Sequence, residues 1–190
     1  MTNRVLLLYS TVDGHTREIC ERQRTKLAAS GLEVTVEELT SDWSQDLSGF
    51  AAVVLGASIR YGKHRPEVAA FIEQQCDYLA STPSAFFSVN AVARKAAKKT
   101  PETNPYVRKF LATIPWQPEL IGIFAGKIDY PSYRFFDKHM IRFIMWMTKG
   151  PTDLNGTFEF TDWDSVDTFA QRVADQVVPP GTRQQLSLIH

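Results

Sequence analysis

The stretch at residues 5–19, VLLLYSTVDGHTREI, decides the fold. It begins with an apolar run at residues 5–8, which is typical of a strand covered on both faces. Small hydroxyl residues, a glycine and an expected helix start follow. This arrangement often binds phosphate, because a helix N-terminus carries unpaired N–H groups and a partial positive charge. The loop by itself is equally compatible with a helix-start turn capped by Asp13.

As a phosphate site, the loop is suited to a monophosphate. Ser10, Thr11 and Thr16 offer hydroxyl groups, and Gly14 lets the backbone close around an anion. The sequence has neither GxxxxGK[ST] nor GxGxxG here, which argues against a triphosphate or a conventional dinucleotide site. Asp13 is unexpected, since a carboxylate repels phosphate. We expect it to turn away and cap the helix, with weaker phosphate binding as the consequence.

Strand and helix patterns alternate along the chain. Strands are expected at residues 5–9, 33–39, 50–58, 83–92, 120–126 and 157–161, and helices at 14–30, 66–79, 102–113 and 162–178. We expect Asp162 to cap the last helix. The alternation predicts a doubly wound α/β domain, a parallel sheet with helices on both faces. Ligands of such sheets bind outside the carboxyl ends of the strands, where the strand order reverses.

Length and charge limit the possible classes of protein. The 190 residues suffice for one core, so we expect a single domain over residues 1–178 and a loose tail at 179–190. The zero net charge gives no reason to expect a nucleic-acid partner. The two cysteines have no paired spacing and no secretion signal is apparent, which favours the cytoplasm. The sequence leaves a homo-oligomer open.

Three loops resemble those of the flavodoxin family. Residues 10–16 match its flavin mononucleotide (FMN) loop, except that common flavodoxins have threonine at the position of Asp13. Residues 56–62, GASIRYG, resemble the loop that flanks the isoalloxazine, with Tyr61 expected against the ring, and residues 88–95, SVNAVARK, resemble the second flanking loop. The resemblance implies a flavodoxin-like five-stranded sheet and FMN bound by Ser10, Thr11, Val12, Asp13, Gly14, His15, Thr16, Ala57, Ser58, Ile59, Arg60, Tyr61, Ser88, Val89, Asn90, Ala91, Val92 and Ala93.

Longer motifs resemble the family of flavodoxin-type, quinone-dependent protoporphyrinogen dehydrogenases. They are STxDGxTREI, GASIRYG, PSAFxSVNxVARK, TPxTNxYxRKFL and TDWxxV, spread over residues 4 to about 175. The resemblance implies oxidation of protoporphyrinogen IX to protoporphyrin IX in heme biosynthesis, with electrons passed to menaquinone or ubiquinone. Flavin chemistry needs no protein dyad for these two-electron steps, so we assign no catalytic residue.

Residues 127–156 form an aromatic, Met-rich segment. It resembles the insertion that interrupts the fifth strand of long-chain flavodoxins, with residues 120–126 and 157–161 as the two parts of that strand. Residues 133–149 predict a basic amphipathic helix, which suits a membrane interface, although packing on the core is the commoner role of such helices. We expect a peripheral protein on the inner face of the cell membrane. The expected substrate or membrane contacts are Arg94, Lys95, Arg134, Phe136, Lys138, Arg142, Phe143 and Trp146.

Two other functions remain open. The first is an NAD(P)H-dependent quinone reductase, since flavodoxin-like reductases often lack an identifiable nicotinamide motif. The second is a non-enzymatic electron-transfer flavodoxin, against which the neutral chain and the basic insertion argue. Arg94 and Lys95 could pair with substrate carboxylates or lipid head groups, or could simply be solvated.

Overall fold

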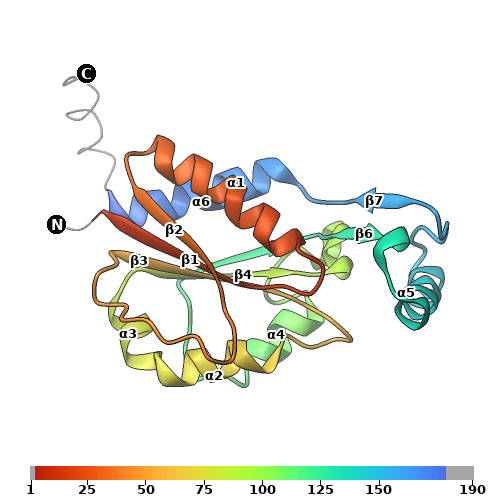
Figure 1. Cartoon of the computed structure of the whole chain (residues 1–190), viewed down its shortest axis with the longest axis horizontal. Coiled ribbons are helices and arrows are strands. Elements are labelled where there is room, and N and C mark those ends of the chain that lie inside the picture. The colour runs from red at the N-terminus through yellow and green to blue at the C-terminus, as the bar shows by residue number, and fades with distance from the viewer. Residues whose placement is uncertain (1–2, 179–190) are drawn as a thin grey trace.

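The computed structural model describes residues 3–178. The predicted loose tail at 179–190 lies outside the described residues. Five parallel strands form the main sheet in the order β2-β1-β3-β4-β5 (Figure 1). They are β1 (Arg4–Ser10), β2 (Glu33–Glu38), β3 (Ala52–Ser58), β4 (Ser84–Val89) and β5 (Leu120–Phe124). The prediction of a doubly wound, five-stranded parallel sheet is confirmed, and the strand order reverses between β1 and β3.

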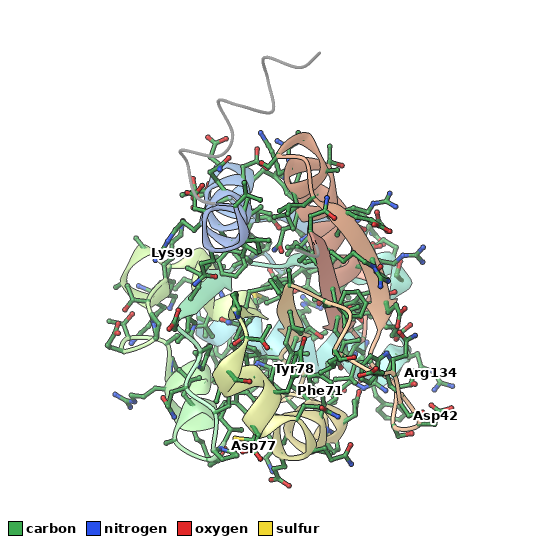
Figure 2. The ribbon with its side chains drawn as sticks, turned by 90° about the vertical axis from the view of Figure 1, so that its left-hand side faces the viewer. Asp42, Phe71, Asp77, Tyr78, Lys99 and Arg134 are labelled. Atoms are coloured by element: carbon green, nitrogen blue, oxygen red, sulfur yellow. The ribbon has the colours of Figure 1, made fainter. Side chains whose placement is uncertain are left out.

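Helices cover both faces of this sheet (Figures 1 and 2). On one face lie α1 (His15–Ala29) and α6 (Trp163–Val177), and on the other lie α2 (Pro66–Gln74), α3 (Cys76–Ser81) and α4 (Pro105–Leu111). The strand β1 supplies both cores: Leu7 packs toward α1 and α6, whereas Leu6 and Leu8 pack toward α2 and α3. Burial of each of these leucines stabilises the fold by about 1.5–3 kcal/mol.

Some predicted boundaries are wrong for local reasons. The helix expected at 66–79 is two helices, because Gln75 leaves helical geometry at φ −109° and ψ 16°. The helix expected from 102 begins only at Pro105, where Asn104 accepts hydrogen bonds from two backbone N–H groups. The prediction that Asp162 caps the last helix is confirmed, since its carboxylate accepts the N–H of Ser165 at 3.2 Å.

The segment after β5 stands away from the main sheet. It contains β6 (Lys127–Asp129), the 3₁₀ turn η3 (Tyr130–Ser132), α5 (Phe135–Met147) and β7 (Thr157–Glu159). The interpretation of residues 157–161 as the second part of the fifth strand is wrong, because β7 pairs antiparallel with β6 in a separate two-stranded sheet. This small unit lies beyond the carboxyl ends of the main strands (Figure 1). No helix in the described part of the chain has the length and apolarity needed to cross a bilayer.

Candidate functional site

The carboxyl ends of three neighbouring strands are aligned. Ser10 at the end of β1 is in register with Ala57 of β3, which in turn is in register with Ser88 of β4. The Ile59 N–H donates to the carbonyl of Val89 at 2.8 Å, which joins the loop after β3 to the end of β4. The three loops predicted from sequence therefore meet at one edge of the sheet, at the point where strand order reverses.

The loop after β1 has the geometry of an anion cradle. Gly14 lies in the left-handed region at φ 81° and begins α1 without a side-chain cap. Its N–H donates to Thr11 Oγ1 at 3.0 Å, so the hydroxyl hydrogen of Thr11 is left for another acceptor. Thr16 Oγ1 is buried without a hydrogen-bond partner among the described residues. A buried unpaired hydroxyl costs about 1–3 kcal/mol, and a phosphate oxygen is the kind of acceptor that would remove this cost. The loop therefore fits a phosphate.

Asp13 does not cap α1, so that prediction is wrong. Its carboxylate lies beside the guanidinium of Arg60 in the loop after β3, with Nη1 at 3.0 Å from Oδ1 and 2.9 Å from Oδ2. A fully charged, nearby cation is a stronger partner for a carboxylate than the N–H groups of a helix start. Arg60 thus removes part of the repulsion that Asp13 would exert on an anion in the cradle.

Ser10 is bound differently from its predicted role. Its hydroxyl donates to Glu67 Oε1 at 3.0 Å, and Glu67 pairs with Arg65 Nε at 2.8 Å. Arg65 Nη1 also donates to the carbonyl of Thr11 at 3.1 Å. The start of α2 thus brings Arg65 next to the cradle together with its carboxylate partner Glu67, whereas residues 10–16 contain no lysine or arginine.

His15, also expected to bind the cofactor, is buried beneath the loop. Its Nδ1 lies 2.9 Å from Glu18 Oε2 and its Nε2 lies 2.6 Å from Thr161 Oγ1. The Thr161 hydroxyl also donates to the carbonyl of Ala125 at 2.9 Å. The side chain of His15 therefore fixes the start of α1 against the segment that follows β7. By contrast, the side chain of Val12 is exposed.

The loop after β3 is attached to α5. Arg60 Nη2 pairs with Asp137 Oδ2 at 2.8 Å, and the hydroxyl of Tyr61 donates to the same carboxylate. The pKa of Asp137 is lowered, chiefly by the hydrogen bond from Tyr61 and further by the charge and the hydrogen bond of Arg60. The guanidinium also lies 5.4 Å from the ring centre of Tyr133, where burial and the charge of Asp13 raise the pKa of the phenol to about 12. We call Arg60, Tyr61 and Asp137 the Arg60 clasp.

Tyr61 itself is in an unusual conformation. Its φ of 50° lies in the left-handed region, which costs a residue other than glycine about 1–2 kcal/mol. Its side chain is 57% exposed even though its hydroxyl is bound to Asp137. The ring is therefore accessible at the edge where the resemblance expects an isoalloxazine, and it is held there by α5.

A buried polar network supports the loop after β4. Ser88 Oγ lies 3.1 Å from His64 Nε2 and accepts from Asn90 Nδ2 at 3.2 Å. Asn104 Nδ2 donates to Asn90 Oδ1 at 3.0 Å, which connects the loop to the start of α4. Burial lowers the pKa of His64 to about 4, so the imidazole is neutral at pH 7, and its Nδ1 has no partner among the described residues. This network fixes the loop without any charged side chain.

The second attachment of α5 is to the loop after β4. Arg94 Nη2 donates to the carbonyl of Thr148 at 2.9 Å and to its hydroxyl at 2.7 Å, while Nη1 donates to the carbonyl of Ala91 at 2.8 Å. We call Arg94 and Thr148 the Arg94 clasp. Together the two clasps hold α5 near both of its ends, one to each loop that the sequence predicts to flank a flavin.

The face of α5 turned away from the protein is apolar. Met145 is buried against Ile128 and Tyr130, and it anchors the helix. Of the nine large apolar side chains exposed in the described residues, seven lie on α5. They are Phe135, Phe136, Met140, Phe143, Ile144, Trp146 and Met147. We call them the α5 apolar patch. The predicted helix is thus confirmed, and its aromatic side faces outward rather than into the core.

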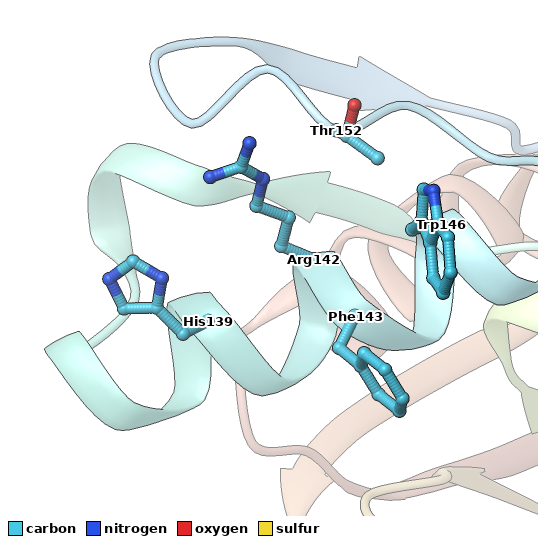
Figure 3. A pocket seen from close by; sticks show the side chains of 5 residues that line it. All are labelled: His139, Arg142, Phe143, Trp146 and Thr152. Carbon is cyan, nitrogen blue, oxygen red and sulfur yellow. The ribbon is translucent and has the colours of Figure 1, made fainter.

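Two cavities lie beside this helix. One, of about 270 Å³, is lined by His139, Arg142, Phe143, Trp146 and Thr152 (Figure 3). The other, of about 410 Å³, lies beside the loop after β4 and includes Arg94, Lys95 and Lys149 in its lining. Arg134 and Phe136, two other expected contacts, are exposed, and Lys138 is partly buried. The predicted substrate contacts are therefore divided between the two cavities and the outer face of α5.

Several residues of this site were not found from the sequence. They are His64, Arg65, Glu67, Asn104, Tyr133 and Asp137. Their contacts link segments far apart in the chain, and no local spacing predicts such links. The nearest available signal was position: His64 and Arg65 directly follow the loop GASIRYG.

Comparison with known proteins agrees with this geometry. A family model described as a flavodoxin domain matches residues 6–155. A protoporphyrinogen IX dehydrogenase (quinone) of Escherichia coli strain K12 is 41% identical over 171 residues, covering 90% of this chain and 94% of that protein. A protein of the same name from Leishmania major is 43% identical over 178 residues, covering 92% of this chain and 77% of that protein.

Solved structures support the fold. Oxidised flavodoxin 1 from Bacillus cereus aligns with a TM-score of 0.52 at 14% identity, covering 92% of this chain and 97% of that chain. Oxidised flavodoxin 2 from the same organism aligns with a TM-score of 0.51 at 17% identity, covering 91% of this chain and 99% of that chain. At such low identity these similarities concern the fold alone.

Proposed function

The chain belongs to the flavodoxin-domain family, and we propose on that premise that it is an FMN-dependent protoporphyrinogen IX dehydrogenase with a quinone as electron acceptor. The observation that carries this proposal is the 41% identity to a relative of that name over 90% of the chain. The flavodoxin-domain match, over residues 6–155, includes the three loops that converge at the carboxyl edge of the sheet. The cofactor is FMN, and the protein is an oxidoreductase of porphyrin biosynthesis.

The residues at the sheet edge fit FMN. Thr11, Thr16 and the first N–H groups of α1 are placed to hold its phosphate, and the unpaired hydroxyl of Thr16 gains an acceptor. Ser58 Oγ, also buried without a partner among the described residues, is available at the ring end of the site. Tyr61 and the loop at 90–93 flank that end. When bound, FMN supplies two-electron chemistry by accepting a hydride at N5.

The protein's own part in the reaction is binding and orientation. The two clasps hold α5 across the two flavin-flanking loops, so an apolar macrocycle has a fixed wall to pack against. The buried network beside the loop after β4 contains no charged side chain, and His64 in that network is neutral at pH 7.

We also propose that α5 contacts the membrane surface and that the quinone, menaquinone or ubiquinone, enters from there. The α5 apolar patch gathers most of the exposed large apolar side chains of the described residues in one helix. Arg134, Lys138, Arg142 and Lys149 accompany it and favour anionic head groups. Because a quinone is dissolved in the lipid, it would reach the protein from the side that contacts the membrane. Such a contact would make the protein peripheral to the membrane, and we propose that it lies on the inner face.

The reaction is tested by anaerobic mixing. Protoporphyrinogen IX added to the FMN-loaded protein should bleach the flavin absorbance, and a quinone added afterwards should restore it. Bleaching by NADPH but not by protoporphyrinogen would instead identify an NAD(P)H-dependent quinone reductase. Bleaching by neither donor, with electrons accepted only from a protein partner, would identify an electron-transfer flavodoxin.

The membrane contact is tested by sedimentation with vesicles that contain phosphatidylglycerol. The Phe136→Ser and Trp146→Ser double variant should bind these vesicles at least tenfold more weakly, because two large apolar groups no longer enter the interface. The control is Lys109→Gln, which changes an exposed residue on α4, away from α5. Equal binding of the double variant and the wild type would refute the proposal.

A further inference from the structure

The cavity beside the loop after β4 is lined by cations that have no anionic partner. Arg94, Lys95 and Lys149 line it, together with Thr148, Pro151 and Phe160. Within residues 3–178 none of the three cations forms an ion pair, and no carboxylate lines the cavity. Its volume of about 410 Å³ leaves room for part of a ligand. Charge alone therefore suits the cavity to an anion.

The guanidinium of Arg94 is the clearest case of a cation without an anionic partner. It is partly buried, and the acceptors it contacts are two carbonyls and one hydroxyl, all neutral. Burial lowers its pKa, which means that its charged form is less well solvated there than in water. A carboxylate in the cavity would supply the missing counter-charge.

The turn after α5 is fixed against this guanidinium. Gly150 packs so closely that an added Cβ would lie 3.1 Å from Arg94 Nη2 and 2.5 Å from Met145 Sδ. The hydroxyl of Tyr130 donates to the carbonyl of Pro151 at 2.7 Å, which anchors the far side of the turn. Lys149 adopts a left-handed φ of 57° between these anchors. The basic side chains thus start from a rigid frame rather than from a loose surface loop.

The position of the cavity connects it to the reaction. Arg94 ends the 3₁₀ turn η1 (Ala91–Arg94), whose earlier residues belong to the predicted flavin-flanking loop. A substrate that places its ring at the flavin edge can therefore reach the cavity with a side arm. Phe160 lines the same cavity and offers an apolar contact for the carbon chain of such an arm.

We infer that this cavity is the subsite for a carboxylate arm of the substrate, bound by Arg94, Lys95 and Lys149. The inference rests on the proposed function, because protoporphyrinogen carries propionate arms on an otherwise apolar macrocycle. Lys95 and Lys149 bind the carboxylate directly. Arg94 has a second role through the Arg94 clasp, so the test leaves it unchanged.

The test compares the free acid with its dimethyl ester, in one detergent and without lipid. The Lys95→Gln and Lys149→Gln double variant should raise the KM for protoporphyrinogen about three- to tenfold, with kcat nearly unchanged. The KM for the dimethyl ester should be the same in the wild type and the double variant. Lys149→Arg should retain the preference for the acid, and Lys109→Gln serves as the matched neutralisation outside the cavity.

A second readout separates this inference from the proposed function. Fluorescence titration with the product, protoporphyrin IX, and with its dimethyl ester measures the same preference without turnover. A wild type that prefers the acid in binding but oxidises neither substrate would keep the subsite and refute the dehydrogenase. A wild type that oxidises both substrates, with a KM ratio that the double variant leaves unchanged, would refute the subsite alone. Loss of vesicle binding with an unchanged ratio would assign the cations to lipid phosphate and refute the subsite as well.

Discussion

The Arg60 guanidinium and the Asp13 carboxylate form an ion pair, 2.9 Å apart, between two loops that are 47 residues apart in the sequence. The pair explains how a phosphate loop tolerates an acidic residue directly before its glycine. It also joins the cradle to the Arg60 clasp, since the other end of the same guanidinium contacts Asp137 on α5. The predicted phosphate loop and α5 therefore share one cation.

Asp13→Asn should tighten the binding of FMN. The substitution removes a negative charge beside the phosphate, and only part of that charge is offset by Arg60, which also serves Asp137. We expect the Kd of the apoprotein for FMN to fall about three- to tenfold at low ionic strength, and less at high salt. Quenching of flavin fluorescence measures it. Asp77→Asn, an exposed site on α3, is the matched control, and an unchanged Kd in Asp13→Asn would contradict the argument.

Asp137→Asn should loosen α5. The variant removes the ion pair with Arg60 and weakens the hydrogen bond from the Tyr61 hydroxyl, so the first turns of α5 should open more often. Hydrogen exchange of the amides in the first half of α5 should accelerate about five- to thirtyfold. Lys138→Gln, at the next position, should not have this effect.

Acid should act on the same clasp. The pKa of Asp137 is lowered in the folded protein, so its contribution to stability is present above the ordinary aspartate value of about 3.9 and is lost as the pH falls below it. Exchange of the α5 amides should therefore accelerate in the wild type below about pH 4, and Asp137→Asn should remove that dependence. The Arg60 clasp would be contradicted if, below about pH 4, hydrogen exchange of the α5 amides accelerated no more in the wild type than in Asp137→Asn.

His64→Gln should remove a pH dependence of global stability. In the unfolded chain His64 takes up a proton below about pH 6.5, whereas in the folded protein burial lowers its pKa to about 4. The free energy of unfolding should therefore fall as the pH drops from about 6.5 to 4, by at most about 1.4 kcal/mol per pH unit. Glutamine keeps a donor for Ser88 and cannot titrate.

Urea unfolding at several pH values measures this difference. The curve of the free energy of unfolding against pH should be flatter for His64→Gln than for the wild type. His139→Gln, on the exposed side of α5, should keep the wild-type slope. Parallel curves for His64→Gln and the wild type would show that His64 is not the group responsible.

Gln23→Leu should stabilise the protein. Gln23 on α1 is fully buried, and neither its amide oxygen nor its amide nitrogen has a hydrogen-bond partner among the described residues. An apolar side chain of similar size removes this desolvation cost, and we expect the free energy of unfolding to rise by about 1–3 kcal/mol. Urea titration at pH 7 checks it, with the exposed Gln74→Leu as control. A destabilised Gln23→Leu would mean that the amide is satisfied after all.

The local parts of the structure could be predicted from the sequence. The run at 5–9 is apolar at every position except the last, and such a strand is stable only between two covered faces, which predicted the parallel sheet. The Asp162 cap was equally accessible, because its hydrogen bond spans three residues. The common edge of the three loops followed from topology, since parallel strands all end on one side.

Other features depended on pairings between distant segments. Residues 157–161 alternate between polar and apolar side chains, a pattern that is compatible with many partner strands. Their pairing with β6 rather than with the main sheet could therefore not be predicted from this pattern. The buried network of His64, Ser88 and Asn104 likewise joins three separate segments. A short polar side chain has several possible hydrogen-bond partners, and the sequence does not indicate which of them it contacts in the folded protein.

By itself, the sequence determined the sheet, its helices and the common edge of the three loops that are predicted to bind a flavin, because hydrophobic periodicity and chain order act locally or through topology. Only the tertiary structure decided the role of Asp13. A helix cap and an ion pair both satisfy a carboxylate, and the choice depended on whether a cation from another loop came within reach. Arg60 does, and the same guanidinium contacts both Asp13 and Asp137 on α5.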